Sequence, residues 1–236
     1  MHSHLVGTIP FFTVDRGVSM SNKIIVAAMI AAGVIAAPAV QADETGLMIR
    51  ARGVYVTFDN SQNDGLGATA NALAGHAGSE ISANDRLIPE VDFSWFFTKN
   101  IAAELVLTYP QTVDIQLNDT YIGKIKALPP SLVLQYHFTD FGAFKPYVGL
   151  GVNYTLFSSR DNIIAGAAGQ ATVENSSVGM VGQIGFDYMF TKSLGLNFDV
   201  KYIQMETDVV LKASGTKVGA LGLSPITTGV GLTYKF

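Results

Sequence analysis

Charged side chains recur at alternate positions in several stretches of this chain. Arg50 and Arg52 are two residues apart, and so are Asp199 and Lys201. Several charges of opposite sign can pair with one another in a confined interior, where water is scarce. We predict that nine residues form one charged layer inside the protein: Arg50, Arg52, Glu90, Asp92, Glu104, Asp187, Asp199, Lys201 and Lys235.

The residues needed for catalysis or for metal binding do not form a comparable pattern. An acyltransferase or a protease needs a nucleophile or an acid–base set. Beyond the first twenty residues the chain has only His76, in a Gly/Ala-rich stretch, and His137, and it has no cysteine. Two histidines far apart in the sequence make a poor metal site. We therefore expect no enzymatic activity, no metal and no cofactor.

The final eleven residues show which element carries the alternation. Ile226, Val230, Leu232, Tyr234 and Phe236 share one face, and Thr, Gly and Lys residues occupy the other face. A period of two is typical of a strand between two different environments. A strand that pairs on both edges between lipid and a polar lumen belongs in a closed barrel. One strand of a soluble sandwich is the alternative for this stretch alone.

Eight segments share this alternation, and the connections between them differ in length. Residues 98–100, 139–145 and 191–193 are short turns, whereas residues 59–86 and 158–177 are long loops. Short turns on one rim and longer loops on the other are typical of outer-membrane barrels. The predicted strands cover about 47–58, 87–97, 101 to past 109, a segment ending at 138, 146–157, 178–190, 194 to past 202, and a segment ending at 236.

The two faces of these strands favour a membrane barrel over a soluble one. The apolar face carries no charged residue, whereas the charged layer lies on the opposite face. Aromatic residues bracket the apolar band, as interfacial girdles do. We predict an all-β fold, an eight-stranded antiparallel transmembrane β-barrel with short periplasmic turns and longer extracellular loops. The predicted girdles are Tyr55, Tyr109, Tyr154 and Tyr202 at one interface, and Phe97, Phe138, Phe190 and Phe236 at the other.

The first 42 residues read as a targeting segment rather than as part of the fold. Lys23 precedes an apolar run over residues 24–40, and Val40-Gln41-Ala42 resembles a signal-peptidase site. We interpret residues 20–42 as a signal peptide, residues 1–19 as upstream sequence translated in error, and residues 43–236 as the barrel. The run is short for a transmembrane helix. The formal net charge of −4 argues against a nucleic-acid partner.

Several motifs resemble those of the OmpW family. They include Leu128-Pro129-Pro130-Ser131-Leu132, the stretch from Lys145 to Thr155 that begins Lys-Pro-Tyr-Val-Gly, and the final Tyr234-Lys235-Phe236. The resemblance covers essentially the whole of residues 43–236. It implies an eight-stranded barrel in the outer membrane of a Gram-negative bacterium, associated with the passage of small hydrophobic molecules. The terminal aromatic strand resembles the signal that the outer-membrane insertion machinery reads.

Above the charged layer the predicted lumen becomes apolar. On the first strand the inward series continues from Arg52 to Val54, Val56 and Phe58. Such a surface, open toward the loops, is a concave site for an apolar ligand. We call the following nine residues the apolar cup: Val54, Val56, Phe58, Ile88, Phe157, Ile203, Met205, Leu221 and Leu223. Ordinary core packing that caps the barrel is the alternative interpretation.

Prolines suggest how a ligand would leave the cup. Pro110, Pro129 and Pro130 lie at matching heights on neighbouring predicted strands. Proline cannot donate to a strand ladder, so it marks weakened pairing. We predict a lateral exit into the membrane at this height, with outer-membrane lipids and small hydrophobic solutes as partners. The alternatives are prolines that only bend the strands, and a structural, adhesive or receptor barrel without transport activity.

Overall fold

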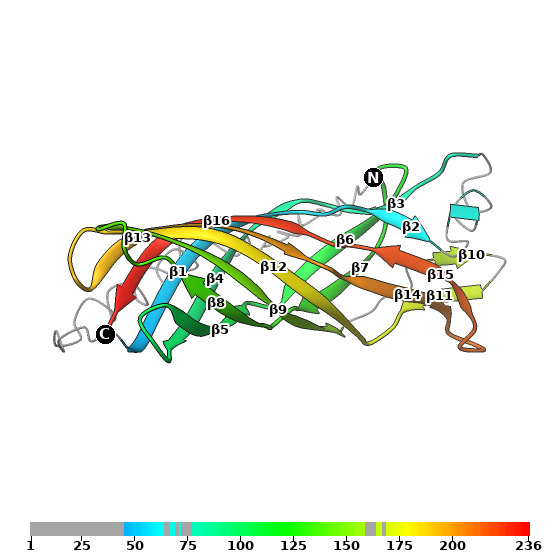
Figure 1. Ribbon diagram of the computed structural model, residues 1–236. Helices are drawn as coiled ribbons and strands as arrows, with labels where there is room; N and C mark the ends of the chain where they lie inside the picture. The colour runs from blue at the N-terminus through cyan, green and yellow to red at the C-terminus, as the bar shows by residue number, and fades with distance from the viewer. Residues whose placement is uncertain (1–44, 64–66, 69–70, 72–76, 159–163, 167–168) are drawn as a thin grey trace, which may run out of the picture. The chain divides into compact units, whose positions relative to one another are not determined.

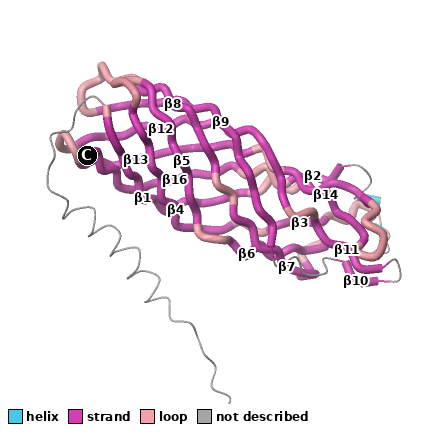
Figure 2. Tube along the Cα trace, turned by 90° about the horizontal axis from the view of Figure 1, so that it is seen from below, coloured by secondary structure: helices cyan, strands magenta, loops and turns pink. Residues whose placement is uncertain are grey.

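Eight strands form a closed antiparallel barrel. The computed structural model describes residues 45–63, 67–68, 71, 77–158, 164–166 and 169–236, so the predicted signal peptide, the upstream segment and His76 lie outside the described residues. The sheet runs β12-β13-β16-β1-β4-β5-β8-β9, and the pairing of β9 with β12 closes it (Figures 1 and 2). The barrel strands are β1 (Gly46–Thr57), β4 (Arg86–Phe96), β5 (Ile101–Thr108), β8 (Ser131–His137), β9 (Phe144–Ser158), β12 (Ser176–Met189), β13 (Leu194–Ile203) and β16 (Ile226–Lys235). The predicted fold class is confirmed.

Further strands extend the wall beyond the barrel at the end with the longer connections (Figure 1). One group pairs through β7 onto the end of β9, and another forms a separate five-stranded sheet. The sequence analysis expected long loops over residues 59–86 and 158–177, and it expected the strands that begin at 101 and 194 to continue past 109 and 202. The first group is β3 (Ile81–Ala83), β6 (Gln111–Leu117) and β7 (Thr120–Leu128), and the second is β2 (Ser61–Asn63), β10 (Ile164–Gly166), β11 (Gly169–Val173), β14 (Glu206–Leu211) and β15 (Lys217–Gly222).

Local side-chain chemistry explains the tight turns. In two of the three short turns a threonine hydroxyl accepts from the backbone: Thr98 Oγ1 from the Asn100 and Ile101 amides, and Thr191 Oγ1 from the Ser193 and Leu194 amides. Threonine forms such ST-turns because its hydroxyl reaches the backbone two residues on. Between β6 and β7, Asn118 and Asp119 adopt φ of 47° and 63°, as a two-residue hairpin turn requires.

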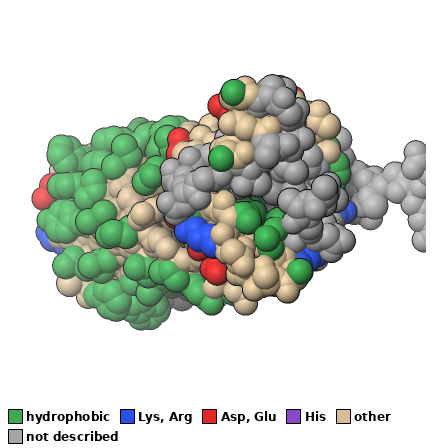
Figure 3. Space-filling model, turned by 90° about the vertical axis from the view of Figure 1, so that its right-hand side faces the viewer, with side chains coloured by type: hydrophobic (Ala, Val, Ile, Leu, Met, Phe, Trp, Pro, Cys, Tyr) green, Lys and Arg blue, Asp and Glu red, His purple; other side chains and the backbone are tan. Residues whose placement is uncertain are grey.

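The outer surface carries the apolar band. Leu134 and Leu150 on neighbouring strands are 59% and 69% exposed, and the girdle residues Tyr55, Tyr109 and Phe97 also project outward. Hydrophobic side chains cover much of the surface at the left of Figure 3. Such exposure is stable only where lipid replaces water. Within the described residues we find no helix with the length and apolar character needed to cross a membrane.

Strand bounds differ little from the predicted ones, apart from the wall above the membrane band. β5 ends at Thr108, one residue before Tyr109, and the wall resumes only at Gln111 with β6. Leu221 belongs to β15 and Leu223 to the connection before β16 rather than to one continuous last strand. Proline has no backbone N–H to donate to a strand ladder, which explains why the strands divide at Pro110 and Pro225.

Candidate functional site

Eight buried charged residues form what we call the ionic layer: Arg50, Arg52, Glu90, Asp92, Glu104, Asp187, Asp199 and Lys201. Arg50 is the centre of its lower part. Its guanidinium is fully buried and forms ion pairs with Glu104 at 2.5 Å and with Asp187 at 2.7 Å. The Asp187 carboxylate also accepts from Arg50 Nε at 3.0 Å and from the Thr233 hydroxyl at 2.5 Å. These partners come from β1, β5, β12 and β16, so the cluster ties strands together across the lumen.

Arg52 and Lys201 form the upper part of the same layer. Arg52 Nη2 lies 2.9 Å from Glu90 Oε1 and also pairs with Asp92, while its Nη1 lies 3.2 Å from Asp199 Oδ1. Lys201 Nζ lies 2.9 Å from Glu90 Oε1 and 2.7 Å from Asp199 Oδ1. Every charged member is at most 5% exposed. Eight of the nine residues predicted for the charged layer therefore lie together.

Neutral residues complete the layer, and the sequence analysis did not single them out. Gln183 donates to Glu104 at 2.9 Å and to Asp199 at 2.7 Å, and so joins the two clusters. The Tyr147 hydroxyl donates to Asp199 at 3.1 Å and accepts from Asn197 at 3.0 Å. These hydrogen bonds lower the cost of burying Glu104 and Asp199, whereas Asp92 is held by its ion pair with Arg52 and its carboxylate oxygens have no hydrogen-bond partner among the described residues. Gln183 and Asn197 could have been found from the sequence, because alternation places both on the inward face of their strands.

Glycines on the inner wall make room for these large side chains. A Cβ on Gly185 would lie 2.6 Å from the Tyr147 ring, and a Cβ on Gly149 would lie 2.9 Å from Gln183 Oε1. An eight-stranded barrel has an interior that side chains just fill. The layer therefore occupies the lumen at this height and leaves no wide aqueous pore through it.

Lys235 lies apart from the other residues predicted for the charged layer. It is half-buried at the end with the short turns, and its Nζ lies 4.7 Å from the centroid of the Phe96 ring. Its place follows from the register, because Lys235 pairs with Met48, two residues below Arg50. It lines the periplasmic mouth rather than the ionic layer.

The residues of the apolar cup all belong to the interior above the ionic layer. Eight of them are at most 6% exposed, and Phe58 is partly buried. They fall into two hydrophobic clusters. Val54, Val56 and Ile88 form one with Phe58 against it, and Phe157, Ile203, Met205, Leu221 and Leu223 belong to the larger one.

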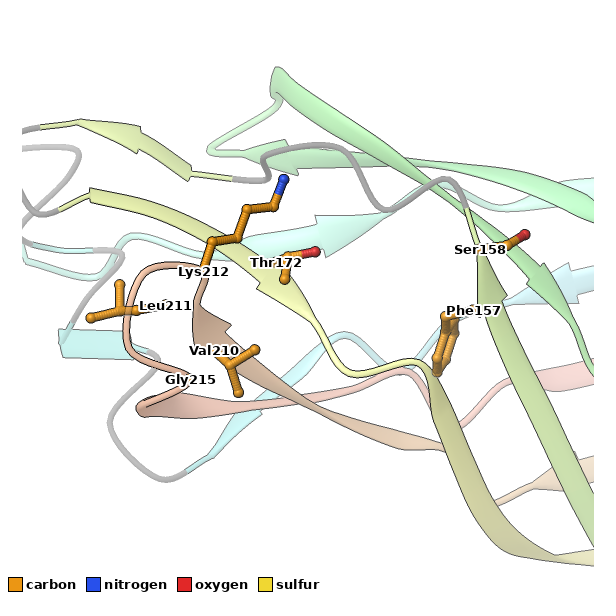
Figure 4. Close-up of a pocket in the computed structure, with 7 residues that line it drawn as sticks. All are labelled: Phe157, Ser158, Thr172, Val210, Leu211, Lys212 and Gly215. Carbon is orange, nitrogen blue, oxygen red and sulfur yellow. The ribbon is translucent and has the colours of Figure 1, made fainter.

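A cavity of about 620 Å³ opens at the extracellular end of the larger cluster. Phe157, at the end of β9, lies on one side, and Val210 on β14 lies on the other (Figure 4). Lys212 and Gly215 belong to the turn that follows β14. This volume falls in the range of small-molecule sites. Only Phe157 among the cup residues reaches it.

Strand pairing is interrupted at the predicted lateral exit. The β5–β8 ladder stops at Val106 opposite Ser131, and the β6–β7 ladder begins at Gln111 opposite Ala127. Pro110 is exposed, and Pro129 and Pro130 are half-buried. Residues 107–110 and 128–130 are all described, and no backbone hydrogen bond joins these two segments. On the neighbouring side, the β4–β5 ladder stops at Glu90 opposite Thr108.

A second interruption, at Pro225, is bridged. The β13–β16 ladder stops at Tyr202 opposite Ile226. Beyond it the Ile203 amide donates to the Pro225 carbonyl at 3.0 Å, and the Leu223 amide donates to the Met205 carbonyl at 2.8 Å. The gap at Pro110 is therefore the more open of these two.

A closed eight-stranded barrel with an apolar outer band, short turns at one rim and paired charges inside defines an outer-membrane β-barrel protein. The OmpW family model matches residues 43–236, and the chain belongs to the OmpW family. The uncharacterized outer-membrane protein y4mB of Sinorhizobium fredii is 42% identical over 210 residues, which cover 85% of each protein.

More distant relatives agree in fold. Outer membrane protein W of Vibrio cholerae is 28% identical over 215 residues, which cover 87% of this chain and 95% of that protein. The crystal structure of the outer membrane protein OprG from Pseudomonas aeruginosa is similar with a TM-score of 0.64 and 27% identity, covering 81% of this chain and 96% of that one. The protein is thus an outer-membrane protein of a Gram-negative bacterium.

Proposed function

We propose that the barrel takes up small hydrophobic molecules through the apolar cup and releases them sideways into the membrane. The observation that carries this proposal is the order of features along the lumen. An apolar section lies above an ionic layer, and the strand ladder is interrupted where the two meet, just after Val106. Membership of the OmpW family supports the passage of small hydrophobic molecules.

The ionic layer makes an axial route costly for an apolar ligand. Crossing it would require the ligand to displace paired charges such as Arg50–Glu104. Removing one partner of a buried pair leaves a charge uncompensated, at about 3–5 kcal/mol. A ligand that moves through the gap between residues 107–110 and 128–130 breaks no ladder hydrogen bond there. The lateral path is therefore the cheaper one.

The cup is tested by placing a charge in it. We expect Val56→Asp or Met205→Asp to reduce the flux of an apolar solute into liposomes strongly, because an unpaired carboxylate would face the apolar ligand. Val56→Leu and Met205→Leu keep the surface apolar and serve as matched controls. Flux is compared at equal barrel content. Unchanged flux in both aspartate variants contradicts a ligand-binding cup.

The exit is tested with disulfide staples, since the chain has no cysteine of its own. A cysteine pair at Tyr109 and Leu128, across the open gap, should slow the flux, and reductant should restore it. A pair at Tyr202 and Ile226, which already face one another in the ladder, is the control and should change nothing.

Arg50→Ala with Glu104→Ala should affect uptake less than the first staple. A rise in flux on removing those charges, with no effect of the first staple, makes the route axial.

One observation favours the alternative of a purely structural barrel. Val54 and Leu221 are each 1% exposed, as in an ordinary packed core. If neither the aspartate variants nor the staple changes the flux, the cup residues serve packing alone.

A further inference from the structure

A second cavity lies at the periplasmic end of the barrel. Its volume is about 520 Å³, and we call it the periplasmic vestibule. Its mouth is formed by the three short turns, and its floor by Met48, Phe96, Met189 and His137. It is separated from the apolar cup by the whole ionic layer, so it belongs to neither the cup nor the proposed exit.

The vestibule is closed at its inner end. The His137 ring lies between Phe96 and Tyr147, with ring centroids 4.7 Å and 4.8 Å away. His137 Nε2 also lies 2.9 Å from Gln135 Oε1, and Arg50 lies directly behind, 4.9 Å from the centre of the Tyr147 ring. A solute that enters from the periplasm therefore meets a floor rather than a passage. The vestibule is therefore a hollow closed at its inner end.

The lining carries an excess of positive charge. Four lysines contribute to it, Lys99, Lys145, Lys192 and Lys235, against the two carboxylates of Asp140 and Asp187. Asp187 is neutralised from behind by Arg50, with an ion pair of 2.7 Å. A cleft lined by charge of one sign, with low-dielectric walls, concentrates ions of the opposite sign.

Two of these lysines are placed by the same local device. Phe97-Thr98-Lys99 and Phe190-Thr191-Lys192 repeat the same three residue types at two different turns. In both turns the threonine hydroxyl accepts from the backbone amides that follow, so each lysine projects at the rim. Lys99 and Lys192 are exposed, and neither has an ion-pair partner among the described residues. Lys145 instead donates to the Thr139 carbonyl.

We propose that the periplasmic vestibule is a binding site for phosphate-bearing anions, held by Lys99 and Lys192 at its rim. Lysine binds phosphate as a strongly hydrated point charge on a flexible stem, which suits an open pocket. The aromatic and thioether floor accepts a modest apolar part of such a ligand. Two sources present this chemistry at the site: a free phosphate compound of the periplasm, and the headgroup of a phospholipid from the inner leaflet.

The test uses the protein purified from outer membranes in a maltoside detergent, which carries no phosphate. Inorganic pyrophosphate and short-chain phosphatidylglycerol are titrated separately, and amide NMR signals of residues 98–100, 139–145 and 191–193 report binding. We expect saturable shifts with at least one probe, and at least tenfold weaker binding in Lys99→Gln with Lys192→Gln. Lys212→Gln, an exposed lysine at the other end of the barrel, should bind like the parent.

The two probes distinguish the sources. Binding of pyrophosphate assigns the site to free phosphate compounds, and binding of phosphatidylglycerol alone assigns it to a lipid headgroup. Saturation by neither probe overturns the proposal. An equal response to sodium chloride at the same ionic strength also overturns it, and so does unchanged affinity in the double variant. The amide signals of β4, β5, β12 and β13 check that the double variant keeps the native fold.

Discussion

Arg50 and Val54 belong to the same strand and face the same lumen, yet they are held in opposite ways. Arg50 has two charged partners on other strands, at 2.5 Å and 2.7 Å. Val54 packs against other aliphatic side chains, with no directional contact. Directional contacts fix atoms within tenths of an ångström, whereas apolar contacts require mainly the right volume. The lower lumen therefore suits a rigid seal, and the upper lumen suits a surface that adapts to different ligands.

The largest expected effect comes from removing one cation from the lower lumen. Arg50→Ala leaves Glu104 and Asp187 buried without their shared partner, which should cost about 3–5 kcal/mol of unfolding free energy. Val54→Ala removes two methyl groups from the upper lumen and should cost roughly 1–2 kcal/mol. Urea unfolding of each variant in lipid vesicles gives both values. Equal costs would show that the ion pairs contribute no more than packing.

A change on the lipid side should have a somewhat smaller effect. Leu134→Arg or Phe198→Arg places a charge in the apolar band, at about 2–4 kcal/mol. Both residues are exposed on the outer surface, so the cost arises from lipid rather than from internal contacts. The amount of heat-modifiable, folded barrel in outer membranes is the measurement, with Leu134→Phe as the control. Normal assembly of both arginine variants is incompatible with the assigned lipid face.

Glycines sharpen the contrast between the inner and outer faces. Gly185→Ala would bring a Cβ to 2.6 Å from the Tyr147 ring and displace the group that donates to Asp199, and we expect a loss of about 1–3 kcal/mol. Gly53→Ala, on the outward face with nothing within 4 Å, is the matched control and should be near neutral. The same unfolding assay compares the two. Similar values for both would mean that the layer adjusts freely around Tyr147.

The smallest effect concerns the two ladder interruptions. The amide of Tyr109, in the gap at Pro110, should exchange hydrogen fast, because opening there breaks no ladder bond. The amides of Ile203 and Leu223 should exchange slowly, since each donates to a carbonyl across the break at Pro225. Hydrogen exchange followed by NMR in lipid makes this comparison. Equal protection at both breaks argues against a weakened wall at Pro110.

Alternation, together with the connection lengths and the aromatic girdles, predicted the barrel and most of the ionic layer. Arg50 and Glu104 are 54 residues apart, but strand phase and height place both inside the lower lumen. Alternation does not determine which carboxylate pairs with which cation, because strand tilt and side-chain rotamers decide the distances. Gln183 was missed because a neutral amide gives no charge signal, although it links Glu104 to Asp199.

The regions above the membrane band and at its lower rim were harder to predict. Pro110 separates β5 from β6, and Pro129 and Pro130 separate β7 from β8, so two long predicted strands were each divided in two. Lys235 shares the inward phase of Arg50, yet its height places it at the mouth, and phase carries no information on height. The vestibule depends on Lys99 and Lys192 from two turns and on Lys145 and Lys235 at strand ends, which meet only when the barrel closes.

The filled lumen also bears on the cell envelope as a barrier. An open pore admits salts, dyes and polar antibiotics in proportion to the number of copies in the membrane. We expect a barrel whose cross-section is occupied by Arg50, Arg52, Lys201 and their carboxylates to add no such leak. We therefore expect a bacterium to tolerate this protein at high copy number without becoming sensitive to polar antibiotics, and planar bilayers loaded with many copies to carry little ionic current.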